Sequence, residues 1–231
     1  MITMVKDMQE NKKKIVGIKA AEYIKDGMIV GLGTGSTAKY LVERVGELVK
    51  DGLKIQAVAT SKATEEQARE LGIPLLDVNE VEYLDIAIDG VDEIDKDFNA
   101  TKGGGGALFR EKIVASLSKE VIWIMDDSKL VDAIGDFPLP VEILPYGYKV
   151  TLKRLKDLGL NPVMRLKKNE LYVTDNGNYI ADLHMSAPVD VKDIKEKLDN
   201  TVGVLETGQF LNMCNRIIVG TDDGVKIFEN K

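Results

Sequence analysis

The sequence has very few of the residues on which several common kinds of protein chemistry depend. Its 231 residues include one cysteine, Cys214, and one histidine, His184. A disulfide framework within the chain is therefore excluded, which favours a reducing, cytoplasmic setting, and Cys214 is expected to be a small buried hydrophobe. His184 falls in an expected hairpin, where a lone histidine is usually structural. Acid–base chemistry is therefore expected to rely on carboxylates and lysines.

Long apolar runs and an excess of basic charge are also missing. No hydrophobic run approaches the length that spans a membrane, and the segment MITMVKDMQENKKK lacks the apolar centre of a signal peptide. With 31 basic and 38 acidic residues the formal net charge is −7, which argues against nucleic acid as a partner. The remaining composition is ordinary for a globular chain, so we expect a soluble protein.

Short apolar segments alternate with helical periodicity up to about residue 127. Strands that are apolar throughout are typical of sheets with helices on both faces, and the crossover connections between them make such a sheet largely parallel. The pattern predicts an α/β protein with a Rossmann-like, mostly parallel sheet. The expected strands lie at 28–35, 54–60, 83–89 and 121–127.

The pattern changes after Asp136, where a compact α+β insert is predicted. Its expected parts are a proline-rich crossing segment at 137–147, a helix at 151–159, a hairpin at 170–185 and a helix at 190–200. Apolar strand character returns at 215–228 around an Asp-Gly turn. We therefore expect a discontinuous catalytic domain at 1–132 and 206–231, interrupted by a smaller α+β domain at 133–205.

A first glycine cluster, GLGTGSTA at 31–38, follows an expected strand and opens an expected helix. Glycines let the backbone approach a ligand closely, and the N-terminus of a helix offers unpaired N–H groups and positive potential. The hydroxyls of Thr34, Ser36 and Thr37 add donors, so the cluster suits a phosphate. Neither the dinucleotide pattern nor the Walker pattern is met. A tight turn without a ligand is the alternative.

An acidic cluster, DGVDEID at 89–95, closes the third expected strand. Its first side chains should lie at the carboxyl edge of the sheet, where α/β proteins bind ligands and where the first glycine cluster also arrives. Asp89 and Asp92, on either side of Gly90, are therefore candidates. The calcium-loop pattern fails because Ile94 stands where a glycine is needed, whereas magnesium stays an alternative. A solvated acidic loop is expected for the remaining acids: Glu93, Asp95 and Asp97.

A second glycine cluster, KGGGGALFREK at 102–112, follows the acids. Its backbone can wrap around a small polar molecule and present N–H groups to it, although a plain linker is the alternative. Lys102 brings a cation into the acidic neighbourhood, and Glu111 lies near the start of the next helix. Lys129, in MDDSK after the fourth expected strand, reaches the same edge of the sheet.

In this order, GLGTGSTA, DGVDEID, KGGGGALFREK and DDSK resemble type A ribose-5-phosphate isomerase, and NKKKIVG near the start extends the resemblance over most of the chain. The resemblance implies interconversion of D-ribose 5-phosphate and D-ribulose 5-phosphate through an enediol, in the non-oxidative branch of the pentose phosphate pathway. It also implies no metal or organic cofactor, a small sugar phosphate as the substrate, a ferredoxin-like smaller domain, and a homodimer or homotetramer.

The resemblance assigns roles to individual residues. Glu111 matches the catalytic base, and Lys102, Asp89 and Asp92 complete the implied catalytic set. The implied substrate-binding positions are Thr34, Gly35, Ser36, Thr37, Asp89, Gly90, Val91, Asp92, Lys102, Gly103, Gly104, Gly105, Lys129 and Lys13. Val91 stands where the family more commonly has alanine. The neighbouring Lys12 and Lys14 leave the register of Lys13 open.

Two other functions are weighed against the isomerase. A sugar-phosphate sensor on the same sheet would usually accompany a DNA-binding helix-turn-helix, and no segment suggests one. An acyl-CoA transferase would need a coenzyme A site, which nothing in the sequence indicates. The isomerase hypothesis requires the turn at 34–37, the aspartates at 89 and 92, and the pair Lys102 and Glu111 to meet in one cleft sized for a phosphorylated pentose.

Overall fold

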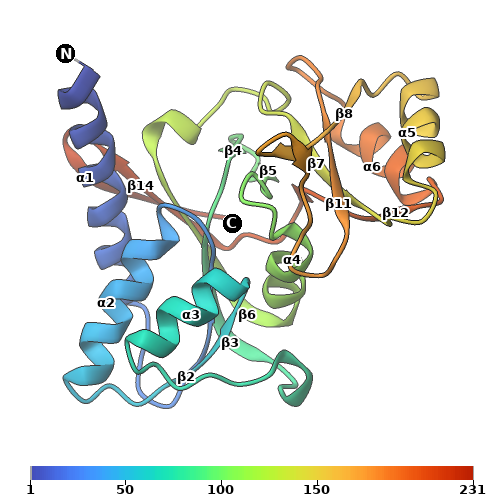
Figure 1. Ribbon diagram of the computed structural model, residues 1–231. Coiled ribbons are helices and arrows are strands. Elements are labelled where there is room, and N and C mark those ends of the chain that lie inside the picture. The colour runs from blue at the N-terminus through green and yellow to red at the C-terminus, as the bar shows by residue number, and fades with distance from the viewer. Residues whose placement is uncertain (1, 231) are drawn as a thin grey trace. The chain divides into compact units, whose positions relative to one another are not determined.

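The computed structural model describes residues 2–230, with side chains from Asp7 onward, so Met1 and Lys231 lie outside it. Within that range the largest sheet has six strands in the order β15-β14-β6-β3-β1-β2, and neighbours pair in parallel except β14 with β15 (Figure 1). The expected α/β class and mostly parallel sheet are confirmed. The strands are β1 (Ile29–Leu32), β2 (Gln56–Ala59), β3 (Leu84–Gly90), β6 (Ser118–Asp126), β14 (Arg216–Thr221) and β15 (Gly224–Glu229).

Helices cover both faces of this sheet (Figure 1). On one face, Val16, Leu41 and Ala68 from three helices share one core with the buried strand residues. On the other face, Val114 of a fourth helix packs in a core with Ala87. These helices are α1 (Ile2–Ala21), α2 (Ala38–Lys50), α3 (Lys62–Glu70) and α4 (Leu108–Leu117). Two short 3-10 helices are η1 (Val78–Glu80) and η2 (Asp127–Lys129).

Helix α4 lies close against β1 and β3 because Gly31 has no side chain. A Cβ at Gly31 would lie 2.4 Å from Val114 Cγ1 and 3.0 Å from Ala87 Cβ, so a larger residue would push α4 off the sheet. Since α4 leads from β3 into β6, which is its parallel neighbour, the helix runs antiparallel to both strands. The first turn of α4 therefore lies at the carboxyl edge of the sheet.

The chain divides into two compact units. The first comprises Met1–Val91, Arg110–Lys129 and Met213–Lys231, and the second comprises Asp92–Phe109 and Leu130–Asn212. The domain limits expected at 133 and 205 stay a prediction, because compactness by itself does not establish a domain that folds alone.

The second unit is built on a four-stranded antiparallel sheet in the order β12-β7-β11-β8. Leu139 and Val141 of the sheet pack with Leu155 and Leu198 from two helices. The elements of this layer are β7 (Leu139–Ile143), α5 (Tyr148–Asp157), β8 (Pro162–Met164), β11 (Tyr179–Leu183), α6 (Val191–Asp199) and β12 (Val204–Thr207). Shorter pairings involve β4 (Glu93–Ile94), β5 (Ala100–Thr101), β9 (Leu166–Lys167), β10 (Glu170–Leu171) and β13 (Gln209–Phe210).

The expectation of a crossing segment at 137–147 is wrong, because β7 lies there and is buried throughout. Proline usually excludes a central strand because it has no N–H to donate. The carbonyl of Pro140 accepts from Gly208 N (2.7 Å), so its nitrogen faces the side of β12. Strand β12 pairs only as far as Thr207 opposite Val141, so Pro140 lies beyond the end of that ladder and costs it no hydrogen bond.

Only the turn of the expected hairpin at 170–185 is present. Thr174 N donates to Asn178 O (2.8 Å), and a single bridge joins Val173 to Tyr179. The main partners of β11 are β7 and β8 instead. The buried carboxylate of Glu142 in β7 explains this, since its Oε1 accepts from Thr174 Oγ1 (2.8 Å) and ties the turn to the four-stranded sheet.

The solvated loop expected for Glu93, Asp95 and Asp97 is correct only for Asp97, which is exposed. Glu93 and Asp95 are 3% and 8% exposed. Glu93 Oε1 accepts from Gly135 N (2.8 Å) and Oε2 accepts from Phe137 N (3.2 Å). Buried carboxylates persist only when such donors replace water, and these donors come from a segment far along the chain.

Replacing Glu93 with glutamine is expected to lower the free energy of unfolding by about 1.5–3 kcal/mol, the usual range for hydrogen bonds to a charged group. The amide can accept one of the two backbone N–H groups but turns its own NH2 toward the other. Chemical denaturation of wild type and E93Q measures the difference. An unchanged midpoint and slope would show that the buried carboxylate contributes nothing to stability.

Cys214 is 4% exposed and is buried as expected. Burial raises the pKa of its thiol to about 12, so the side chain stays neutral at physiological pH. Within residues 2–230, no helix combines the length and the apolar character needed to cross a membrane.

Candidate functional site

The turn after β1 is fitted to the carboxylate that ends β3. Thr34 N donates to Asp89 Oδ1 (2.9 Å), and Gly90 N donates to the same oxygen (2.7 Å). A Cβ at Gly33 would lie 2.2 Å from Asp89 Oδ1, so only glycine leaves room for this carboxylate. Asp89 is 3% exposed. The first glycine cluster and the first predicted aspartate are therefore one structural feature at the carboxyl edge of the sheet.

The hydroxyl of Thr34 faces a cluster of other hydroxyls that sequence reasoning did not identify. Thr34 Oγ1 lies 2.7 Å from Thr60 Oγ1, 2.8 Å from Ser61 Oγ and 3.1 Å from Thr64 Oγ1. Ser61 Oγ also accepts from Thr64 N (3.1 Å) and is the N-cap of α3. Thr34 therefore braces its turn through its side chain, while its backbone holds Asp89. The sequence could have indicated this cluster, because its other hydroxyl residues follow β2 and so reach the carboxyl edge of the sheet, as Thr34 does.

The rest of the first turn is open. Gly35 and Ser36 are exposed, and Thr37 is half-buried. Gly35 has a φ of +106°, a left-handed conformation that favours glycine. Thr37 occupies the N-cap position of α2 without a capping hydrogen bond from its side chain. The first turn of α2 has no acidic residue, so its N–H groups and positive potential suit a phosphate or another small anion.

Glu111 lies in the first turn of α4 and is 5% exposed. Because α4 runs antiparallel to β3 and β6, this turn is at the same sheet edge as Asp89. The positive end of the helix favours a carboxylate there and opposes the cost of burying it. The first unit therefore carries the turn at 34–37, Asp89 and Glu111 at one edge of its sheet, and the expected single cleft that also includes Asp92 and Lys102 stays a prediction.

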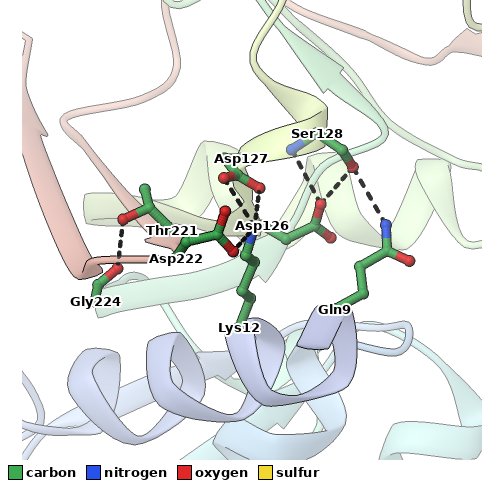
Figure 2. A network of polar contacts seen from close by, with 8 residues as sticks. All are labelled: Gln9, Lys12, Asp126, Asp127, Ser128, Thr221, Asp222 and Gly224. Atoms are coloured by element: carbon green, nitrogen blue, oxygen red, sulfur yellow. Dashed lines mark hydrogen bonds and ion pairs between the residues drawn. The ribbon is translucent and has the colours of Figure 1, made fainter. Parts of the chain in front are cut away.

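A lysine of α1 is anchored at the carboxyl ends of β6 and β14 (Figure 2). Lys12 Nζ lies 2.9 and 3.0 Å from the two carboxylate oxygens of Asp127 and 2.9 Å from Asp222 Oδ1. Gln9 Nε2 donates to Ser128 Oγ (3.5 Å) one turn earlier on the helix. Hydrogen bonds from Lys12 to Asp222 and Asp127 raise the pKa of the lysine above its ordinary value.

This arrangement bears on which of the three neighbouring lysines, Lys12, Lys13 or Lys14, matches the family's substrate-binding lysine. Lys12 forms ion pairs with both aspartates, and Lys14 is exposed. Lys13 has a side chain that is 18% exposed, and its Nζ lies 3.9 Å from Glu10 Oε2. Lys129 is half-buried and ends η2, directly after β6. Lys13 and Lys129 stay the predicted contacts of the substrate.

Replacing Lys12 with methionine is expected to lower the melting temperature by a few degrees at low salt. The loss should shrink near 1 M salt, where the Debye length is only about 3 Å. The stability that the Lys12 ion pairs add is present in full below the ordinary lysine pKa of 10.5. It is lost as the pH rises through the raised pKa of Lys12 in the folded state. Melting curves of K12M at two salt concentrations test this, with the exposed K14M as control. Equal melting temperatures for both variants would show that the ion pairs of Lys12 with Asp127 and Asp222 do not stabilise the fold.

In the second unit, Asp92 is joined to the second glycine cluster. Gly104 N donates to Asp92 Oδ2 (2.7 Å), and a Cβ at Gly104 would lie 2.6 Å from Asp92 Oδ1. Gly106 N donates to Gly103 O (2.9 Å), so the cluster forms a tight turn rather than a loose linker. Gly103 has a φ of +98° and needs the conformational freedom of glycine. Asp92 and the turn at 103–106 are therefore one preorganised feature.

Lys102 precedes this turn and is 2% exposed, which is rare for a lysine. Its N–H donates to Gly208 O (2.9 Å), which anchors the backbone, and its Nζ lies 5.3 Å from the centre of the Phe210 ring. A buried ammonium group is costly unless anions or ring faces stabilise it. Lys102 is thus a fixed cation at the start of the glycine turn, which suits a developing negative charge.

The predicted residues fall into two sets. Thr34, Gly35, Ser36, Thr37, Asp89, Gly90, Val91, Glu111, Lys129 and Lys13 belong to the first unit, and Asp92, Lys102, Gly103, Gly104 and Gly105 belong to the second. Each set carries groups for binding an anion and for moving a proton. Among the residues that the structure describes, no three histidine, cysteine, aspartate or glutamate side chains are grouped so as to hold a metal ion.

The chain resembles known proteins over nearly its whole length. Residues 56–224 match the family described as ribose 5-phosphate isomerase A (phosphoriboisomerase A). Ribose-5-phosphate isomerase A of Enterococcus faecalis is 53% identical over 218 residues, covering 94% of this chain and 96% of the relative. The solved ribose 5-phosphate isomerase of Plasmodium falciparum is 41% identical, with a TM-score of 0.91 and coverage of 96% and 99%. A D-ribose-5-phosphate isomerase solved in complex with phospho-erythronic acid is 36% identical, with the same TM-score and coverage.

Proposed function

This chain belongs to the ribose 5-phosphate isomerase A family and interconverts D-ribose 5-phosphate and D-ribulose 5-phosphate, and we propose that Glu111 is the base that moves the proton between C1 and C2. The observation that carries the proposal is the placement of Glu111 in the first turn of α4, at the sheet edge where Asp89 ends β3. A buried carboxylate at that edge can face a bound sugar while remaining shielded from bulk water.

The reaction needs one base that acts at two adjacent carbons. With the sugar ring open, the Glu111 carboxylate takes the proton from C2, and the electrons of that bond form the C1=C2 double bond of the enediol. The former carbonyl oxygen at C1 receives a proton. Loss of the proton from the C2 hydroxyl then forms the ketone while Glu111 returns its proton to C1. A base within about 3 Å of both positions can perform both transfers.

The oxygen of the enediol carries negative charge in the transition state, and Lys102 is our candidate for stabilising it. The fixed ammonium group and the glycine turn at 103–105, through the N–H of Gly105, act as preorganised donors, which cost no reorganisation during the reaction. The burial of Lys102 strengthens its electrostatic interaction relative to water.

Asp89 and Asp92 are proposed to open the sugar ring and to shuttle protons among the substrate hydroxyls. Gly90 and Val91 lie between these aspartates in the sequence and are proposed to contact the substrate through their backbone. The turn from Thr34 to Thr37, at the N-terminus of α2, binds the phosphate, and Lys13 and Lys129 add positive charge to it. This division assigns anion binding to one group of residues and proton transfer to another.

We also propose that the enzyme works in the cytoplasm as a homodimer or homotetramer. The single cysteine is buried with its thiol neutral, which suits a reducing compartment. Light scattering of the purified chain measures the oligomeric state directly.

A coupled assay with D-ribose 5-phosphate, run with and without a chelator, tests the proposal. Turnover that is unaffected by the chelator is expected, because the proposed steps use side chains and backbone donors only. Absence of turnover in the wild-type chain would reject the isomerase and leave a sugar-phosphate sensor. Loss of turnover on chelation would restore the magnesium alternative at the acidic cluster.

A further inference from the structure

The second glycine turn is held from outside by an arginine that sequence reasoning did not select. Arg165 Nη1 donates to Gly103 O (2.8 Å) and to Gly104 O (3.0 Å). Arg165 follows β8, and its own N–H donates to Ile180 O of β11 (2.8 Å), so the base of the side chain is fixed to the sheet. One guanidinium nitrogen therefore fixes two successive carbonyls of a turn made of glycines, which have the least intrinsic preference for any conformation.

The guanidinium group is in turn held by Asp182 of β11. Arg165 Nε donates to Asp182 Oδ2 (2.9 Å), and Nη2 donates to Asp182 Oδ1. The two side chains are 15% and 18% exposed, so the pair is sheltered from salt. The planar fork uses one edge for the carboxylate and the remaining nitrogen for the turn. A lysine has a single ammonium point and cannot reproduce both contacts.

The orientation of the carbonyls decides where the N–H groups of the turn point. The peptide bond between Gly104 and Gly105 is trans, so the C=O of Gly104 and the N–H of Gly105 point in opposite directions. With Gly104 O turned toward Arg165, Gly105 N–H is turned away from it. Among residues 7–230, whose side chains the structure describes, no side chain or backbone group accepts from Gly105 N–H, and Gly105 is exposed. Gly104 N–H is already donated to Asp92, so Gly105 supplies the donor that the turn offers to a ligand.

We propose that Arg165, held by Asp182, is a positioning residue that fixes the Gly104–Gly105 peptide so that Gly105 N–H donates to the substrate oxygen on which charge develops. The inference rests on the proposed function of the second glycine turn. Tyr172 supports the same turn from one side, since its hydroxyl donates to Gly105 O (3.3 Å) and a Cβ at Gly106 would lie 2.3 Å from Tyr172 Oη. Removing Arg165 leaves the donor in place but lets the peptide rotate.

The test compares R165Q and R165K with R216Q in the full-length chain. Arg216 is a matched control, since it pairs with Glu120 and Glu229, its side chain is 18% exposed, and it belongs to the first unit. Loss of one oxyanion donor costs about 10²–10³-fold in kcat, so a misoriented donor should cost about tenfold or more. We expect this loss in both R165Q and R165K, with KM within about threefold of wild type, and near-normal kcat in R216Q.

Other outcomes would overturn the proposal. Recovery of kcat in R165K would show that charge alone matters, and equal kcat for R165Q and R216Q would show that the arginine only stabilises the fold. An inactive wild-type chain would reject the proposed function instead, so the two failures are distinguishable.

A binding measurement covers the case in which R165Q does not fold. D182N keeps the volume of the side chain and one acceptor, so it loosens the arginine without removing it. In chain labelled with 15N-glycine, the Gly105 amide should shift when phospho-erythronic acid binds to wild type, and this shift should be reduced in D182N. An unchanged shift in a folded D182N would overturn the proposal. Melting curves establish which variants are folded.

Discussion

Replacing Glu111 with glutamine is expected to lower kcat by about 10²–10⁴-fold, the range that a positioned general base contributes. Glutamine keeps the size of the side chain and its place in the first turn of α4, but it cannot accept a proton from carbon. Binding of phospho-erythronic acid should stay within about threefold of wild type, because the fold and the other contacts persist.

Isotope exchange makes this result specific to proton transfer. In D2O the wild-type chain should wash the C2 hydrogen out of ribose 5-phosphate, and E111Q should lose exchange and isomerisation together. E93Q is the matched control, since it also removes a buried carboxylate and should change stability without changing kcat. Near-normal exchange in E111Q would assign the base to another residue.

Replacing Lys102 with methionine is expected to lower kcat by about 10²–10³-fold, as for loss of one donor to a developing oxyanion. Methionine is apolar and of similar length, so it should tolerate the burial that Lys102 experiences beside Phe210. KM should change far less than kcat if the ammonium group acts mainly in the transition state.

Steady-state kinetics of K102M and K12M separate this role from a general effect of removing a lysine. Lys12 is also well sheltered, at 14% exposure, but its partners are Asp127 and Asp222. K12M should therefore lose thermal stability and keep kcat within about threefold of wild type. A K102M variant as active as K12M would remove Lys102 from the catalytic set.

Local sequence patterns were enough to predict the first unit. The strands β1, β2, β3 and β6 were visible because apolar runs between helical segments need no knowledge of distant residues. The N-cap of α3 is equally local, since the hydrogen bond from Thr64 N to Ser61 Oγ spans three residues. The glycines around Thr34 and Gly103 were also informative, because close backbone approaches require them locally.

Interactions between distant segments account for the errors. Glu93 was placed in a solvated loop because its donor, Gly135, lies 42 residues away. The strand β7 was missed because Pro140 is tolerated only where β12 has ended, and the sequence does not state where a neighbouring strand stops. Arg165 was missed because it reaches Gly103 across 62 residues and its surroundings resemble an ordinary basic surface segment.

The sequence alone was enough to predict the alternating fold of the first unit and the family, and to propose candidate residues for phosphate binding and proton transfer, since each depends on short stretches of chain. Tertiary structure alone decided which carboxylates are buried, that Thr34 turns its hydroxyl toward Thr60, Ser61 and Thr64, and that an arginine holds the second glycine turn. The reason is physical. Burial and hydrogen bonding of a polar side chain depend on partners that only the folded chain brings near.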